Sequence, residues 1–176
     1  IEIMLGRRQL REKVMQSVYA YNSLGTEGDE RIVEKNLMKG IDQIYDLYIY
    51  LLNLVKVQQE IASNKIELAK NKNFPTQEDL NPNMKFVNNK MFKILNQNLE
   101  LSRYTQNNKM YDWDIYDTYP NNIFNKLVES DLYKDYMKND VNSFDEDQEF
   151  IINFFVEFIA EYEDLHDWFE GIQLNW

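Results

Sequence analysis

The residues with the clearest chemical potential lie near the N-terminus, where Arg7, Arg8 and Arg11 are followed by Lys13. On a helical wheel the three arginines fall within an arc of about 100°. Each guanidinium group presents a rigid fork of donors that matches phosphate oxygens, and the open N–H groups of a helix N-terminus also favour an anion. These residue types therefore predict a phosphate-binding site on the first turns of a helix.

Catalytic and metal-binding patterns are scarce. The chain has no cysteine and one histidine, His166, which excludes thiolate sites and leaves little for a triad. Glu163 and His166 form a Glu-x-x-His step of the kind used in di-iron bundles, but such a site needs a second copy with its own histidine. We therefore expect a protein that acts by binding and is not an enzyme, with no cofactor and no metal.

An aromatic tract contains Trp113, Tyr116 and Tyr119, whose rings could stack on unpaired bases at about 1–3 kcal/mol per base. Three acids lie among these rings and would repel the phosphates between the bases: Asp112, Asp114 and Asp117. We expect instead that the aromatic side chains anchor a connecting segment on a helical bundle.

The net charge of -11 is unevenly distributed. The segment from Val141 to Trp176 contains ten acids and no Lys or Arg, which leaves 19 basic and 20 acidic residues in positions 1–140. An acidic total therefore does not exclude a nucleic-acid site, because phosphates respond to the local field. The acidic segment could be a solvated face, dock a basic partner, or shield the arginines.

Length and composition predict one globular domain or two small ones: 176 residues, 44% hydrophobic and 28% charged. The apolar spacing predicts an all-α fold. Apolar residues recur at steps of three and four, and no segment alternates with period two. We expect a bundle of about five helices with one long central helix. The expected helices are Arg7–Tyr21, Asp29–Lys72, Met84–Tyr104, Ile123–Tyr136 and Ser143–Phe169.

Two local expectations follow from the same patterns. Leu10, Val14, Val18 and Tyr21 should form the buried face of the first helix. Ser143 should cap the last one. No apolar run approaches the roughly 20 residues of a membrane span, and the N-terminus lacks a signal-peptide pattern, so we expect a cytoplasmic protein without membrane contact.

The order of residues from Arg7 to Tyr19, Arg-Arg-x-x-Arg-x-x-Val-Met-Gln-x-Val-Tyr, resembles the opening helix of the NusB family of bacterial transcription antitermination factors. The family form is Arg-Arg-x-x-Arg-x-x-Ala-Leu-Gln-x-Leu-Tyr. The resemblance implies an all-helical factor that binds the boxA element of single-stranded RNA with ribosomal protein NusE, and reaches RNA polymerase indirectly. It implies the following RNA-binding residues: Arg7, Arg8 and Arg11, supported by Lys13.

Other parts of the chain depart from the family. Its C-terminal pattern has an echo in mid-chain, at Ile66–Lys70 and Lys85–Asn89, and residues from about Asn108 onward match nothing in it. We expect a NusB-like region in residues 1–107, and an acidic, aromatic-rich helical extension in residues 108–176 packed on it as one unit. The usual C-terminal bundle would lie beyond Trp176. The alternative is an all-helical protein-protein interaction module in which the arginines pair with the acidic segment.

Overall fold

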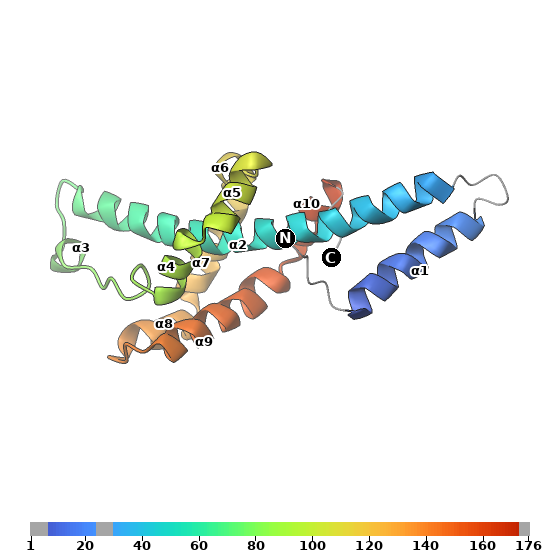
Figure 1. Ribbon diagram of the computed structural model, residues 1–176. Helices are drawn as coiled ribbons and strands as arrows, with labels where there is room; N and C mark the ends of the chain where they lie inside the picture. The colour runs from blue at the N-terminus through green and yellow to red at the C-terminus, as the bar shows by residue number, and fades with distance from the viewer. Residues whose placement is uncertain (1–6, 24–29, 173–176) are drawn as a thin grey trace. The chain divides into compact units, whose positions relative to one another are not determined.

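The protein is built from helices alone in the residues that its computed structural model describes, 7–23 and 30–172 (Figure 1). The prediction of an all-α fold is confirmed. Within these ranges, ten α-helices and one π-helix, η2, replace the expected bundle of about five helices. They are α1 (Arg7–Ser23), α2 (Glu30–Lys70), α3 (Gln77–Leu80), α4 (Lys90–Gln97), α5 (Leu99–Asn107), α6 (Asp112–Ile115), α7 (Thr118–Glu129), α8 (Asp131–Lys138), α9 (Phe144–Phe154), η2 (Phe155–Ala160) and α10 (Glu163–Gly171).

Helix α2 is the long helix that the apolar spacing predicts. Its 41 residues contain no proline and give a length of about 60 Å. It begins with an acidic and ends with a basic residue, which agrees with the helix dipole. The hydroxyl of Ser63 donates to the Gln59 carbonyl oxygen at 2.9 Å, and α2 continues unbroken through this position. Neither α2 nor any other described helix combines the length and apolarity needed to cross a membrane.

The described chain divides into two compact units, and α2 belongs to both. The first unit contains the described residues up to Tyr48 and those from His166 onward, and the second unit is Ile49–Leu165. The predicted division into residues 1–107 and 108–176 concerned composition and family resemblance, and it stays a prediction.

The core of the second unit centres on Phe86, just before α4. Its ring lies edge-on to those of Phe92, Phe124 and Phe150, with centroid distances of 5.1, 6.1 and 5.9 Å. This arrangement places the positive edge of one ring against the negative face of another. Helices α2, α7, α9 and η2 surround the aromatic cluster with fully buried side chains: Leu54, Ile123, Leu127, Phe154 and Ile159.

Polar caps explain why there are more helices than expected. Asn98 ends α4 and caps α5, because its side chain accepts from two backbone N–H groups of α5 at 3.0 Å. Ser130 acts in the same way between α7 and α8, accepting from an α8 N–H at 3.1 Å. Both residues adopt an extended backbone conformation that a continuing helix would not allow. The expected helices Met84–Tyr104 and Ile123–Tyr136 are therefore each divided.

The C-terminal helical segment begins as predicted and changes its winding later. Ser143 Oγ accepts from the Glu146 N–H at 3.1 Å and caps α9. After α9 the chain winds as η2, whose turns contain more residues than those of an α-helix. Buried Ile159 therefore follows buried Phe154 by five positions, and Phe158, which the sequence places on the buried face, is only half-buried.

In the first unit, α1 runs alongside the beginning of α2 (Figure 1). Lys13 of α1 lies over Gly40 of α2, since a Cβ atom added to Gly40 would lie 4.0 Å from Lys13 Cδ. That separation is an ordinary van der Waals contact. The aliphatic stem of Lys13 therefore packs on α2, and the space does not require glycine.

We expect Gly40→Ala to raise the free energy of unfolding by about 1 kcal/mol, because alanine is the better helix former and its methyl group meets no close neighbour. Gly171→Ala is the matched control with a smaller effect, since Gly171 is the last residue of α10. Urea denaturation followed by circular dichroism measures both. A destabilised Gly40→Ala protein would contradict the described packing of α1 on α2.

Candidate functional site

The predicted phosphate-binding residues differ in their accessibility. The side chain of Arg8 is 92% exposed, and Arg11 is also exposed. Lys13 is half-buried because its stem covers Gly40. Arg7 begins α1, but its side chain lies outside the described residues. Two guanidinium groups of the predicted site therefore face solvent on α1.

The positive charge on α1 is only partly compensated. Arg8 Nε donates to Glu12 Oε1 at 3.1 Å, one turn further along the same helix. The pair is exposed and screened by water, so it contributes little to stability. Among the described residues of the first unit, no ion pair links Arg11 to a carboxylate. The prediction that the arginines pair with the acidic segment stays a prediction.

The apolar face of α1 is turned differently from the prediction. Leu10 and Tyr21 are half-buried as part of the expected buried face, but Val14 and Val18 are exposed. Lys13 occupies the contact with α2 because its stem packs on the α2 glycine. The prediction that Val14 and Val18 are buried is therefore wrong. The stem of Lys13, and not these two valines, contacts α2.

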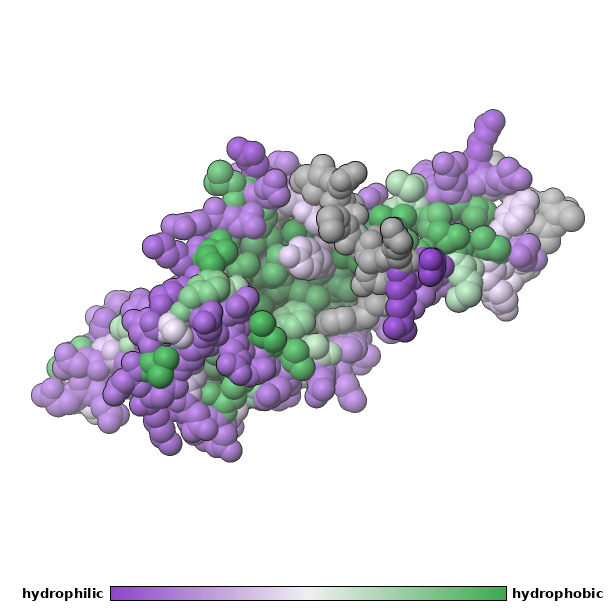
Figure 2. All heavy atoms as spheres, turned by 60° about the horizontal axis from the view of Figure 1, so that its bottom comes forward, coloured by the Kyte–Doolittle hydropathy of each residue, from purple (hydrophilic) through white to green (hydrophobic). Residues whose placement is uncertain are grey.

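The exposed side of α1 combines cationic and apolar residues, and we call it the outer face of α1. Met15 is 67% exposed and Tyr19 is 74% exposed, so two large apolar side chains face solvent. Figure 2 shows hydrophobic side chains beside hydrophilic ones over the α1–α2 hairpin, at the right of the view. Within the outer face, the charged residues lie in the N-terminal half of α1. The outer face consists of Arg8, Arg11, Glu12, Met15, Val18 and Tyr19.

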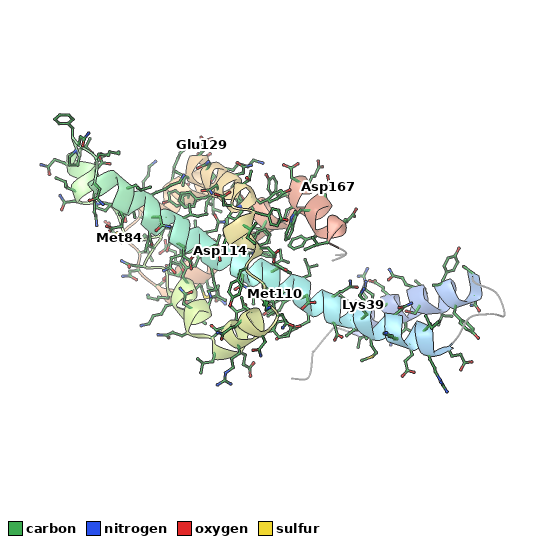
Figure 3. All side chains as sticks on the ribbon, turned by 90° about the horizontal axis from the view of Figure 1, so that it is seen from above. Lys39, Met84, Met110, Asp114, Glu129 and Asp167 are labelled. Atoms are coloured by element: carbon green, nitrogen blue, oxygen red, sulfur yellow. The ribbon has the colours of Figure 1, made fainter. Side chains whose placement is uncertain are left out.

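A second candidate is a cavity of about 360 Å³ between α2 and the α6–α7 segment. Trp113 forms part of its wall and is buried, and its Nε1 donates to the Tyr50 carbonyl oxygen at 2.9 Å. The indole therefore anchors the segment on α2, as predicted, and is not available for stacking on a base. Asp114, labelled in Figure 3, lines the same cavity together with Asp117 and Glu60.

The charged residues that line this cavity are three acids and one lysine. Lys65 also lines it, but its Nζ donates to Asn125 Oδ1 at 2.7 Å and lies 4.9 Å from the Phe124 ring centroid. A cavity with three carboxylates would repel phosphate. The described residues also contain no group of three or more His, Cys, Asp or Glu placed to hold a metal ion.

A buried carboxylate that the sequence does not reveal joins three helices. Asp147 of α9 is 4% exposed. Its Oδ1 accepts from the Tyr136 hydroxyl of α8 at 2.6 Å, and its Oδ2 accepts from the Lys90 N–H at the start of α4 at 3.1 Å. Asn89 Nδ2 donates to Tyr136 Oη and to the Asp147 carbonyl oxygen, both at 3.1 Å. In the sequence, Asp147 is indistinguishable from the exposed acids around it.

Replacing Tyr136 with Phe should lower the free energy of unfolding by about 1–3 kcal/mol, because the buried Asp147 carboxylate loses a donor. Tyr133→Phe is the matched control. Tyr133 packs in the same aromatic cluster, with its ring centroid 5.4 Å from that of Phe86, and its hydroxyl forms no hydrogen bond with a described residue. Chemical denaturation at neutral pH measures both variants, and equal losses would contradict the described network.

The Asp147 network should also make stability depend on alkaline pH. Burial, and then the hydrogen bond to Asp147, raise the pKa of Tyr136. Above the ordinary tyrosine pKa of about 10, the unfolded chain loses this proton while the folded protein retains it, so stability falls as pH rises. Tyr136→Phe should make this decline shallower, as denaturation on both sides of pH 10 would show. An unchanged slope would contradict a buried Tyr136 hydroxyl.

Comparisons with known proteins add no family to this description. No protein-family model, curated protein or solved structure matches the chain. The likeness of residues 7–19 to the opening helix of the NusB family therefore stays a prediction.

Proposed function

We propose that this protein is a helical interaction module that docks a protein partner on the outer face of α1. The observation that supports this most is the exposure of Met15 and Tyr19, at 67% and 74%, beside Val18 on one side of a helix. Grouped apolar side chains at a surface mark contact sites, because burying them against another apolar surface is favourable. Phosphate groups alone would leave Met15 and Val18 without a role.

The arginines restrict the chemistry of the partner. Arg8 and Arg11 lie at one end of the outer face, and the apolar side chains lie at the other end. A helix that brings carboxylates opposite the arginines and apolar side chains opposite Met15 would match both halves. The proposed partner surface is therefore an acidic amphipathic helix, and the protein acts by binding and not by catalysis.

Site-specific photocrosslinking in cells tests this proposal. A photoreactive amino acid at Met15 should yield crosslinked products that protease degrades and ribonuclease leaves intact. Leu99 of α5 is the matched control position, since it is apolar and 68% exposed but lies outside the outer face. Equal protein crosslinking at both positions, or none at Met15, would contradict a docking role for this face.

A second candidate function is RNA binding of the NusB type, with boxA-like single-stranded RNA and ribosomal protein NusE as the implied partners. The exposure of the Arg8 and Arg11 guanidinium groups favours it, because both can reach phosphates. The α1 N-terminus adds open N–H groups and has no acid in its first turn.

For the RNA function, the logarithm of the affinity for single-stranded RNA should fall with the logarithm of salt concentration at a slope of about -2 to -3, at roughly 0.7 per phosphate neutralised. Replacing Arg7, Arg8 and Arg11 with alanine should flatten the slope and leave thermal stability nearly unchanged. Lys35→Ala with Lys39→Ala on α2 is a control with an unchanged slope. Fluorescence anisotropy measures the affinities. The absence of measurable binding at low salt would contradict the RNA-binding function.

A further inference from the structure

The chain itself contains a surface that matches the outer face of α1. On α9 and η2, the side chains of Asp147, Phe150, Ile151 and Phe154 are buried, so the opposite side of the helix faces solvent. Ile152 and Val156 on that side are 54% and 49% exposed. We call this side the outer face of α9. It consists of Asp145, Glu149, Ile152 and Val156, at steps of three and four residues.

In both outer faces the charged residues precede the apolar residues along the chain, and the charged residues of the two faces have opposite sign. On α1, Arg8 and Arg11 precede Met15 and Val18. On α9, two acids precede two apolar residues in the same direction. Arg8 to Val18 spans about 15 Å of helix, and Asp145 to Val156 spans about 16 Å, taking 1.5 Å per residue. Charge, apolarity and length therefore agree along both helices.

We propose that the outer face of α1 of one copy of this chain docks in parallel on the outer face of α9 of a second copy. This inference rests on the proposed function, because it names the partner of the same α1 surface. In the parallel direction the arginines face Asp145 and Glu149, and the apolar halves face one another. The antiparallel direction would bury the arginines against Ile152 and Val156 without a counter-charge.

Charge complementarity also favours a second copy over a generic acidic protein. The segment 141–176 contains no Lys or Arg, so no basic residue within it opposes the arginines of α1. Glu12 also lies on the outer face of α1, where its Oε1 accepts from Arg8, so two arginines and one glutamate leave this face a net charge of +1. Each copy carries a net charge of -11, so the attraction between the arginines and the two acids acts at short range, within about one Debye length.

The contact joins two different surfaces, so it is heterologous. Each bound copy retains one unused face of each kind, and association continues until a ring closes or a filament grows. Sedimentation velocity of the wild-type chain should therefore show species larger than a dimer as the concentration increases.

A charge-exchange experiment tests the pairing. Arg8→Glu with Arg11→Glu, and separately Asp145→Lys with Glu149→Lys, should each weaken self-association at least about tenfold, because like charges then oppose one another. Mixing the two variants should restore assembly, since the reversed α1 face of one matches the reversed α9 face of the other. The unaltered faces of the pair also remain complementary.

Two control pairs carry the same charge changes away from the outer faces. Lys35→Glu with Lys39→Glu lies on α2, and Asp131→Lys with Asp135→Lys lies at the start of α8, as Asp145 lies at the start of α9. Both controls should associate like the wild type. Circular dichroism verifies that every variant is folded. If the Asp145 and Glu149 double variant is unfolded, Ile152→Ser is used in its place. This variant should also weaken assembly.

A wild-type chain that stays monomeric at every concentration would overturn the self-association proposal, as would folded variants that fail to reassemble on mixing. Photocrosslinks from Met15 separate this failure from that of the proposed function. Products of twice the chain mass support self-docking. Crosslinks to a different protein, together with a monomeric chain, would support the proposed docking function of the outer face of α1. They would contradict the proposal that a second copy occupies it. No protein product at all would reject both.

Discussion

The hydrogen bonds of the buried Asp147 carboxylate are the constraint on which the second unit depends. A carboxylate that is 4% exposed needs partners inside the protein, because water cannot compensate it there. Tyr136 and the Lys90 N–H supply them, and this N–H would otherwise be one of the unsatisfied donors at the start of α4. Hydrogen bonds are directional, so they fix how α9 lies on α4 and α8 more strictly than apolar packing alone.

The same interior constraint determines which side of α9 remains outside. With Asp147 and Phe154 directed inward, Glu149 and Ile152 face solvent. On α1 the corresponding choice is made by Lys13, whose stem takes the contact with α2 and leaves Met15 exposed. The contacts between neighbouring helices therefore decide which side chains are exposed in this protein, and residue polarity alone does not.

Regular features could be predicted from the sequence because they depend on local preferences: the long helix α2, the Ser143 cap and the all-α class. The division at Asn98 could not, because a cap and a continuing helix compete and distant packing decides between them. At the candidate site, exposed Arg8 follows from the charge pattern. The rotation of α1 does not, since it depends on how the stem of Lys13 packs on another helix, α2. The burial of Asp147 could not be predicted, because the sequence around it does not distinguish one buried acid from the exposed acids near it.

The π-helical winding of η2 accommodates one residue more than an α-helical turn would. An α-helix turns about 100° per residue, so each extra residue in a turn changes the direction of every side chain after it. In an unbroken α-helix, Ile159 would follow Phe154 by five residues, about 140° further around the axis, and would point away from the core. Removing one residue between Phe155 and Ala160 would place Ile159 one α-helical turn after Phe154, so both side chains would still face the core. The loss of one residue here is therefore a change in length that the core can absorb.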